Sequence, residues 1–392
     1  MSTLFYDFPQ KIFINSMFTF LYELAGYFYK FIEYINYLDA YKILQKLEMM
    51  QMHFYCEKCK KEYPLNSTSY QCSCGGLFRL YKDDKDTIPQ EVSIGEVVTP
   101  LLPIHFGKQE MFFKMEHLNP TGSFKARGAK AMVNVLKHLG VEDIVEDSSG
   151  NGASALAAYA AAANIDCTVY VPESIPAGKL HQIETYGAHV RLVIGNREAT
   201  AEAAKKAVAQ DESYYASHVY NPLFFEGIKS MAYEIYKQLG NKVPEYIFLP
   251  VGNGTMLLGL YYGFEEIGRL PAFVAVQSEN CCPLYNAFKK KRKVAPPSFT
   301  IADAIRVEKP MRLKEMLMAI NRSKGEVITV SDEEIEEAQH QTGRKGIYVE
   351  ATAAVPIAGA LKYFRKGKPD NYRVVIPITG AGLNGPNKKR NK

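Results

Sequence analysis

The sequence predicts an α/β protein built on largely parallel sheets. From about residue 83 onward, short runs rich in valine, isoleucine and phenylalanine alternate with longer amphipathic or alanine-rich segments. Glycine-rich turns follow several of these runs directly. Alternation of this kind favours parallel strands joined by helical crossovers. No repeat with a period of roughly 20–50 residues is visible.

The composition is that of an ordinary globular protein, with 47% apolar and 23% charged residues and a net charge of +5. A chain of 392 residues suggests more than one domain. The dense basic runs, 289–293 and 387–392, fit a solvated loop and a frayed terminus, so no nucleic acid partner is predicted. Seven cysteines, four of them clustered, and no evident secretory signal favour the cytoplasm.

Residues 1–51 are predicted to form an aromatic-rich, helical N-terminal extension. Charged residues such as Glu23 and Lys30 interrupt its apolar stretch, so no membrane span of about 20 residues is expected. Two amphipathic helices near 11–36 and 39–51 fit the pattern better. Their aromatic face could dock on the main domain, pair two subunits or lie on a membrane surface.

The next segment, residues 52–82, is predicted to be a small zinc-ribbon-like module. A Cys-x2-Cys pair is followed after 12 residues by a Cys-x-Cys pair, giving Cys56, Cys59, Cys72 and Cys74. Thiolates suit zinc, and Gly75-Gly76 supplies a tight turn. The second pair is one residue shorter than the usual spacing. A structural zinc is the hypothesis, and a ribbon that keeps its hairpin without metal is the alternative.

Residues 83–392 are predicted to form the catalytic domain, with a smaller subdomain at about 110–220 and a larger one formed by the remainder. An alanine-rich helix is expected at 153–163 and an apolar helix at 256–264. The expected strands are 111–115, 143–147, 167–171, 189–193, 246–251, 272–277 and 373–378.

The stretch Asn119–Ala129 says most about chemistry. It places Lys125 at the start of a predicted helix, after a Pro-Thr-Gly turn and beside Phe124. Partial desolvation and the helix dipole should lower the pKa of this amine. Such a lysine can form a Schiff base, for which pyridoxal phosphate is the usual carbonyl compound. A lone lysine is more often a surface residue, so the hypothesis requires a phosphate site, a pyridine partner and a carboxylate pocket elsewhere.

Two glycine-rich turns could meet the first and third requirements, although glycine turns often serve only to turn the chain. Backbone amides between a strand and a helix can bind an anion, so Gly252, Asn253, Gly254 and Thr255 fit a phosphate. A second strand-to-helix turn is rich in donors. Ser148, Ser149 and Gly150 could bind a substrate carboxylate, and Asn151 could donate to a ring hydroxyl. The alternative is that a serine or asparagine here only caps the alanine-rich helix.

Thr379 meets the remaining requirement. It follows the last predicted strand in Thr379-Gly380-Ala381-Gly382, and open α/β sheets bind ligands outside the carboxyl ends of their strands. A threonine hydroxyl there could hydrogen-bond a pyridine nitrogen without protonating it. That arrangement limits delocalisation of a carbanion, so it favours elimination or replacement over transamination.

The order of these motifs resembles the tryptophan synthase β-like, fold type II pyridoxal phosphate enzymes, and within them the threonine synthase family. The resemblance covers roughly residues 53–384. It implies two α/β subdomains around parallel sheets, a small amino acid substrate and a homodimer. It also implies that Lys125 is the internal aldimine and proton shuttle, that Asn151 contacts the ring oxygen, that residues 252–255 hold the phosphate and that Thr379 faces the ring nitrogen.

Four positions depart from the threonine synthase pattern. Ala126 replaces an aspartate, Gly152 a threonine and Ala381 a histidine. Phe224 stands where the family has an arginine implicated in holding the substrate's phosphate. Losing that arginine removes a bidentate contact worth roughly 1.5–3 kcal/mol per hydrogen bond. The residues expected to hold the cofactor remain, whereas those expected to hold the substrate phosphate are reduced.

Three functions follow in order of preference. The first is threonine synthesis, in which O-phosphohomoserine and water give threonine and phosphate. The second is a sibling β-elimination or β-replacement enzyme, such as a serine/threonine dehydratase or another amino acid synthase, favoured by the dehydratase-like stretch from Thr121 to Ala129. The third is a non-catalytic binding protein that uses the ribbon and the aromatic N-terminus.

Overall fold

A computed structural model describes Tyr27, Lys30 and residues 52–83, 86–195, 197–211, 213–291, 296–365 and 372–384. The helices expected within residues 1–51 and the basic tail 387–392 lie outside the described residues, apart from Tyr27 and Lys30, which are helical. The two larger sheets and the helices named below belong to one compact unit, Phe54–Tyr81 with Ile88–Lys392. Along the described chain, no helix is both long and apolar enough to span a bilayer.

The larger sheet has six strands in the order β12-β11-β10-β13-β5-β4. Five of the strands run parallel to one another. The edge strand β4 pairs antiparallel with β5. The interior strands are almost wholly buried, which explains their continuous apolar sequences. In sheet order the strands are β12 (Glu326–Val330), β11 (Ala272–Ser278), β10 (Tyr246–Pro250), β13 (Val374–Pro377), β5 (Gln109–Lys114) and β4 (Leu101–Phe106).

The smaller sheet has four parallel strands in the order β8-β7-β6-β9. They are β8 (His189–Val193), β7 (Asp166–Pro172), β6 (Asp143–Glu146) and β9 (Tyr214–Tyr215). A third sheet, antiparallel where β1 and β2 pair, has the order β2-β1-β3 and lies in the cysteine-rich segment. Its strands are β2 (Glu62–Tyr63), β1 (His53–Cys56) and β3 (Phe78–Tyr81).

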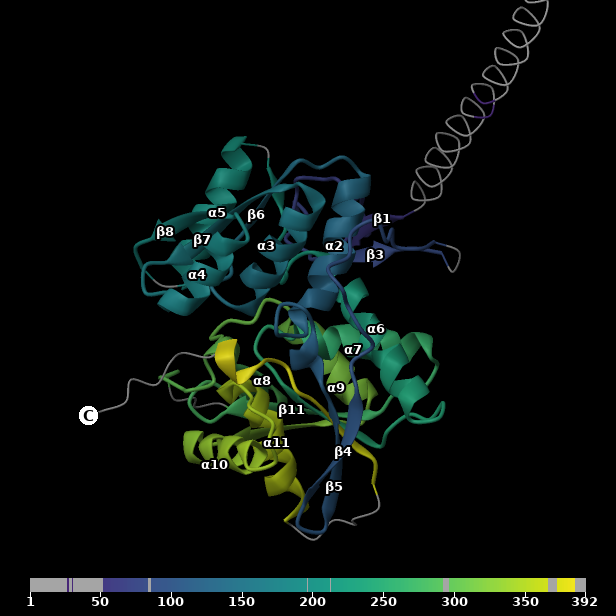
Figure 1. Ribbon diagram of the computed structural model, residues 1–392, viewed down its shortest axis with the longest axis vertical. Coiled ribbons are helices and arrows are strands. Elements are labelled where there is room, and N and C mark those ends of the chain that lie inside the picture. The colour runs from purple at the N-terminus through teal and green to yellow at the C-terminus, as the bar shows by residue number, and fades with distance from the viewer. Residues whose placement is uncertain are drawn as a thin grey trace, which may run out of the picture. The chain divides into compact units, whose positions relative to one another are not determined.

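Helices cover both larger sheets (Figure 1). α3 and α5 pack on the four-stranded sheet, α9 and α11 pack on the six-stranded sheet, and α6 packs against both α2 and α7. The helices are α2 (Lys125–His138), α3 (Asn151–Ala163), α4 (Ala177–Thr185), α5 (Arg197–Asp211), α6 (Pro222–Gln238), α7 (Thr255–Glu266), α8 (Pro283–Phe288), α9 (Leu313–Arg322), α10 (Asp332–Gly343) and α11 (Ala351–Phe364).

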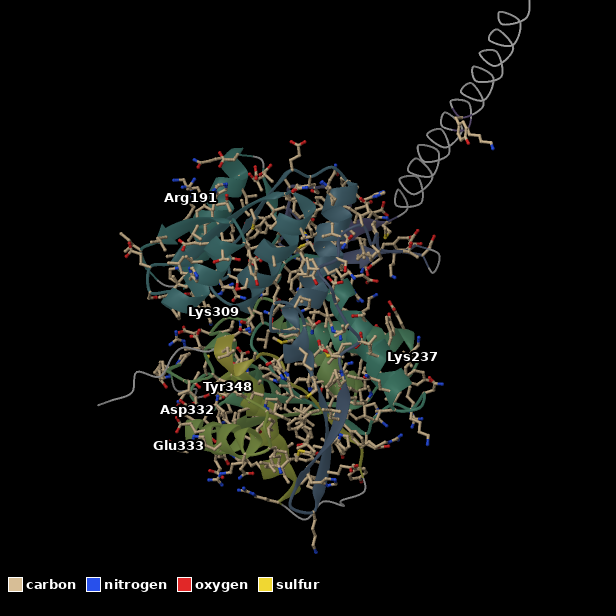
Figure 2. All side chains as sticks on the ribbon, viewed as in Figure 1. Arg191, Lys237, Lys309, Asp332, Glu333 and Tyr348 are labelled. Atoms are coloured by element: carbon tan, nitrogen blue, oxygen red, sulfur yellow. The ribbon has the colours of Figure 1, made fainter. Side chains whose placement is uncertain are left out.

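Local sequence explains where several helices begin. Asn221 caps α6 by accepting a hydrogen bond from the Leu223 N–H at 3.0 Å, and Pro222 occupies the first helical position. Ser331 and Glu334 form a capping box at the start of α10. Apolar side chains of α11 join those of the six-stranded sheet in the main core, whereas charged side chains such as Arg191 and Lys237 lie at the surface (Figure 2).

The parallel α/β architecture predicted from the sequence is confirmed, and each expected strand lies within about two residues of an observed one. β4, β9 and β12 were not expected. β5 pairs with β13 in the six-stranded sheet, although the sequence placed residues 110–114 with the smaller subdomain. β9 is too short, and β4 too exposed, to give a clear apolar pattern.

Candidate active site

Lys125 is the first residue of α2, and the chain around it is fixed by the end of the last strand. The Phe124 N–H donates to the Thr379 carbonyl at 3.1 Å, and Ser123 pairs with Gly380 in an antiparallel bridge. The Ala381 N–H donates to the Gly122 carbonyl at 3.0 Å. Two motifs about 250 residues apart in the sequence therefore form one site.

The environment of Lys125 favours its neutral amine. Burial lowers its pKa from 10.5 to about 8. Arg197 and Lys179 act in the same direction, whereas Glu146 and Glu350 partly oppose the shift. The lowered pKa expected from the sequence is therefore present, with burial as its main cause. A neutral amine is the form that attacks a carbonyl carbon.

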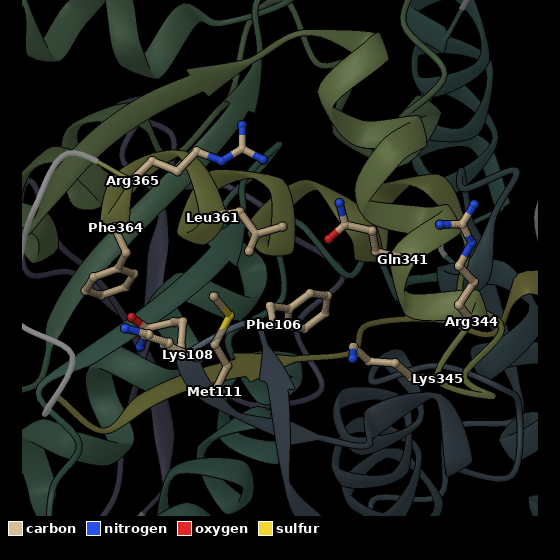
Figure 3. Close-up of a pocket in the computed structure, with 11 residues that line it drawn as sticks. Phe106, Lys108, Met111, Gln341, Arg344, Lys345, Leu361, Phe364 and Arg365 are labelled. Carbon is tan, nitrogen blue, oxygen red and sulfur yellow. The ribbon is translucent and has the colours of Figure 1, made fainter.

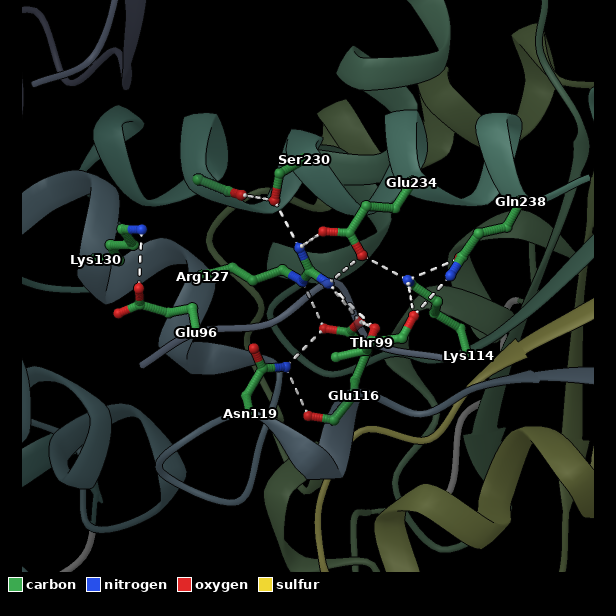
Figure 4. Close-up of polar contacts among 11 residues, drawn as sticks. Glu96, Thr99, Lys114, Glu116, Asn119, Arg127, Lys130, Ser230, Glu234 and Gln238 are labelled. Carbon is green, nitrogen blue, oxygen red and sulfur yellow. Dashed lines mark hydrogen bonds and ion pairs between the residues drawn. The ribbon is translucent and has the colours of Figure 1, made fainter. Parts of the chain in front are cut away.

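Arg127, two residues after the lysine, anchors this part of α2 (Figure 4). Its guanidinium contacts Glu116 at 2.7 and 2.8 Å and Glu234 at 2.6 and 2.7 Å. The Lys114 amine also reaches Glu234, at 2.5 Å, and donates to the Thr99 carbonyl at 2.6 Å. These charges are buried but mutually satisfied, so the network holds the first turn of α2 in place.

The Gly252–Thr255 turn lies between β10 and α7, one strand away from Thr379. A Cβ at Gly252 would lie 3.0 Å from the Cα of Ile305, and a Cβ at Gly254 would lie 2.3 Å from the Met316 sulfur. Gly254 also has a φ of +83°, which favours glycine. No side chain of the described residues caps α7, so its first amides remain available to an anion.

The Thr379 hydroxyl is buried. The residue is 2% exposed, and its Oγ1 makes no hydrogen bond to any residue that the structure describes. A buried hydroxyl normally has a partner. A ring nitrogen at this position would supply one, so the residues present fit the pyridine group of pyridoxal phosphate.

The Ser148–Asn151 turn connects β6 to α3. Gly150 is the N-cap of α3, and no serine or asparagine among the described residues caps the helix through its side chain. The capping alternative for this turn is therefore not what the structure shows. Asn151 donates to the Glu350 carboxylate at 3.2 and 3.3 Å, which links the turn to the start of α11. Burial raises the pKa of Glu350.

Two of the residues that depart from the family pattern, Gly152 and Phe224, take part in close contacts in which only glycine fits. A Cβ at Gly152 would lie 3.0 Å from the Ser148 hydroxyl and 3.1 Å from Nδ1 of His218. Phe224 is fully buried, and its ring occupies the space where a Cβ of Gly128 would be, at 2.3 Å. Ala126 is fully buried in α2, and Ala381 bridges Val349.

Several titratable residues around Lys125 were not predicted from the sequence. They are Glu146, Asp147, Lys179, Arg197, His218 and Glu350. Glu146 ends β6 and Asp147 follows it directly, before the Ser-Ser-Gly-Asn turn. Two acidic residues next to each other at the end of an apolar strand are a signal that the sequence does contain. His218 and Glu350 lie in segments that carry no such local signal.

The four ribbon cysteines converge as the spacing predicted. Their Sγ atoms all lie within 4.8 Å of one another. Cys56 and Cys74 are 3.5 Å apart, and Cys59 and Cys72 are 3.4 Å apart. Four sulfurs around a tetrahedral zinc, each at about 2.3 Å, would be separated by about 3.8 Å. A Cβ at Gly76 would lie 2.3 Å from the Cys56 sulfur, so glycine is required beside the cluster.

A hollow of about 600 Å³ lies away from the lysine, beside the β4–β5 hairpin and α11 (Figure 3). Phe106, Met111 and Leu361 supply apolar lining, and Lys108 and Arg344 supply charge. None of the residues predicted for the active site lines it.

Comparisons with known proteins show the family to which this chain is related. The family model described as "Pyridoxal-phosphate dependent enzyme" matches residues 92–380. Threonine synthase of Methanocaldococcus jannaschii is 36% identical over 375 residues, covering 84% of this chain and 92% of the relative. Threonine synthase of Mycobacterium tuberculosis is also 36% identical, covering 79% and 89%.

Solved structures show the same fold. A pyridoxal 5'-phosphate-dependent aspartate racemase matches with a TM-score of 0.65 and 26% identity, covering 76% of this chain and 92% of that one. A threonine deaminase from T.th. matches with a TM-score of 0.63 and 25% identity, covering 76% and 94%.

Proposed function

Because the chain belongs to the threonine synthase family of pyridoxal-phosphate dependent enzymes, we propose that it converts O-phosphohomoserine and water to threonine and phosphate. The observation that carries the proposal is the joining of Lys125 to the strand end that holds Thr379. This arrangement brings the lysine, the unpaired hydroxyl and the glycine-rich turn to one edge of the sheet. The choice of O-phosphohomoserine as the substrate is inferred from the family relationship.

The cofactor residues have separate roles in this proposal. Lys125 would hold the cofactor through its amine and move a proton at its Nζ. The amides of Gly252, Asn253, Gly254 and Thr255 would bind the phosphate group, Asn151 would donate to the ring oxygen, and the Thr379 hydroxyl would meet the ring nitrogen. When bound, pyridoxal phosphate stabilises negative charge on the substrate carbons next to the amino group.

The substrate residues lie on the smaller sheet. The amides and hydroxyls of Ser148, Ser149 and Gly150 would bind the α-carboxylate at the uncapped start of α3. Lys179 and Arg197 place positive charge around the lysine. In this account they attract the substrate's phosphate, because Phe224 is apolar and packs inward on Gly128.

A dehydratase is the second candidate, and a specific observation favours it. The stretch from Thr121 to Ala129 is dehydratase-like, and the threonine deaminase structure shares the fold at 25% identity. The two functions differ in their substrates. Protein loaded with pyridoxal phosphate should release phosphate from O-phosphohomoserine if it is a threonine synthase, and 2-oxobutanoate from threonine if it is a dehydratase. No phosphate release would contradict the first proposal.

We also propose that Cys56, Cys59, Cys72 and Cys74 hold a structural zinc within a ribbon module at residues 52–82. The convergence of the four sulfurs supports it. Family expectation supports a homodimer, and the clustered, unpaired cysteines support a cytoplasmic location. The proposed arrangement of the chain is the extension 1–51, the ribbon, and a catalytic domain over 83–392.

A further inference from the structure

Glu146 and His218 form a buried pair, and both interact electrostatically with Lys125. Nδ1 of His218 lies 2.7 Å from Oε1 of Glu146, and the His218 backbone N–H donates to Oε2 at 3.3 Å. The side chains of His218 and Glu146 are 9% and 1% exposed, respectively. Glu146 ends β6, and His218 follows β9, the parallel neighbour of β6. The strand pairing and two hydrogen bonds therefore fix the imidazole ring.

The ring lies against the Ser-Ser-Gly-Asn-Gly turn. A Cβ at Gly152 would lie 3.1 Å from Nδ1 and 3.3 Å from Cε1 of His218, so a threonine at position 152 would press on the imidazole. The Phe224 ring packs against the imidazole, with their centroids 5.8 Å apart. Two departures from the family pattern, Gly152 and Phe224, therefore both contact His218.

The charges that face the imidazole keep it neutral. Burial holds the pKa of His218 well below its usual value, and Lys125 on α2 and Arg197 on α5 act in the same direction. Asp147, after β6, opposes them. Burial raises the pKa of Glu146 to about 7, even though Arg197, Lys125 and the His218 N–H favour its carboxylate, so Glu146 is ionised above pH 7. When Glu146 is ionised, its carboxylate accepts a hydrogen bond from Nδ1–H, and this tautomer leaves Nε2 as the basic nitrogen.

Threonine synthesis needs such a base. Loss of phosphate leaves an unsaturated four-carbon amino acid, to which water must add. Of the other buried acids near Lys125, Glu350 accepts from Asn151, and Asp147 contacts Arg197 at 3.5 Å through Oδ2 while its Oδ1 accepts no hydrogen bond from the described residues. A neutral imidazole oriented by a carboxylate is a suitable general base at neutral pH.

We propose that His218, oriented by Glu146, is the base that takes a proton from the added water. The inference depends on the proposed function. One O–H bond of water breaks, its proton moves to Nε2, and the oxygen bonds to the β-carbon. The electron pair of the α,β double bond takes a proton at the α-carbon from Nζ of Lys125. Solvent then carries the proton from His218 to Lys125, which restores both groups, so the overall reaction consumes one water.

The product ratio of His218→Gln tests the role. If water is not activated, the unsaturated amino acid hydrolyses to 2-oxobutanoate and ammonia, which also consumes one water. We expect phosphate release to continue while the fraction of threonine among the products falls at least about tenfold, since general-base catalysis contributes roughly 10²–10⁴-fold. Imidazole added to His218→Ala should restore threonine. An unchanged threonine fraction would overturn the inference.

His138→Gln is the matched control. His138 also pairs with a glutamate, Glu91, at 2.8 Å through Nδ1, but it lies at the opposite end of α2 from Lys125. Its product ratio should equal that of the unmodified protein. If both variants lost the same fraction of threonine among their products, the loss of any buried histidine–glutamate pair would explain the effect. That result would overturn the assignment of His218 as the base.

A readout independent of activity is the tautomer of His218. In the cofactor-loaded protein at pH 8, where Glu146 is ionised, nitrogen NMR of labelled histidines should show His218 as neutral with its proton on Nδ1. A proton on Nε2, or an imidazolium, would contradict a free base. If the unmodified protein releases no phosphate from O-phosphohomoserine, the proposed function fails together with this inference. If it makes threonine and His218→Gln does too, only the inference fails.

Discussion

The ring of Phe224 lies directly on Gly128, so that a Cβ at position 128 would be 2.3 Å from a ring carbon. Gly128 belongs to the lysine motif, and Phe224 replaces the family's arginine. The position expected to bind substrate phosphate is therefore part of the packing between α2 and α6. In the proposed function, other residues must therefore recognise the substrate phosphate. The same contact makes Gly128 intolerant of substitution.

Gly128→Ala should destabilise the protein by roughly 1–3 kcal/mol, because the added methyl group forces the buried Phe224 ring to move. The measurement is the free energy of unfolding in urea. Gly343→Ala is the control, since a Cβ at position 343, at the end of α10, meets nothing within 4 Å. That variant should stay within about 0.5 kcal/mol of the unmodified protein. Equal effects would contradict the packing account.

Arg127→Met should cost roughly 3–5 kcal/mol, because it leaves the buried carboxylates of Glu116 and Glu234 without their cation. Arg373→Met provides the comparison. Arg373 and Glu245 are 34% and 35% exposed, so that pair should contribute only about 0–1 kcal/mol. Similar losses for the two variants in urea unfolding would show that the network around Arg127 does not anchor α2.

Cofactor uptake should depend on pH through the Lys125 amine. Its pKa is lowered from 10.5 to about 8 by burial, so the reactive neutral form gains population as pH rises through 8. The rate of the visible absorbance change on adding pyridoxal phosphate to cofactor-free protein should rise between about pH 7 and 9 and then level off. A rate that still increases near pH 10.5 would contradict a buried amine.

The same shift predicts how stability changes with pH. Between about pH 8 and 10.5 the unfolded chain binds a proton at Lys125 that the folded chain does not. Stability of the cofactor-free protein should therefore rise with pH in that window. In Lys125→Met this contribution to the slope should vanish. Identical slopes for the two proteins would mean that the lysine is solvated in the folded state.

Zinc should be present at one ion per chain and should stabilise the ribbon module. Cys56→Ser should lose the metal, because Cys56 belongs to the four-sulfur cluster. Cys282→Ser should retain it, because Cys282 lies elsewhere in the chain and donates to the Glu279 carbonyl. Metal analysis measures the zinc content of the two variants, and thermal unfolding with and without a chelator measures how much zinc stabilises the protein. A metal-free protein that unfolds at the same temperature with and without the chelator would exclude a structural zinc.

Much of the fold and the lysine site could be predicted because their signals are local. A strand, a glycine-rich turn and a helix follow one another in the sequence around Gly252 and around Asn151. Thr379 directly follows its strand. Parallel strands bring such turns to a single edge of the sheet, so their order along the chain is enough to join them.

The remaining parts of the site depend on pairings between distant segments. Glu146 and His218 are 72 residues apart, and Arg127 and Glu234 are 107 residues apart. No periodicity relates such positions, because a buried charge is stabilised by whichever partner the tertiary fold brings to it. The packing of Phe224 on Gly128 is of the same kind. The sequence indicated that the substrate contacts had changed, but not which side chains fill the space.

The most direct test of the central claim is the reaction of the cofactor-loaded protein with O-phosphohomoserine in water enriched in the heavy oxygen isotope. Phosphate elimination followed by water addition predicts equal amounts of threonine and phosphate, with the heavy oxygen in the threonine hydroxyl and none in the phosphate. Lys125→Ala should form neither product. Labelled phosphate together with homoserine, or no phosphate at all, would contradict the account.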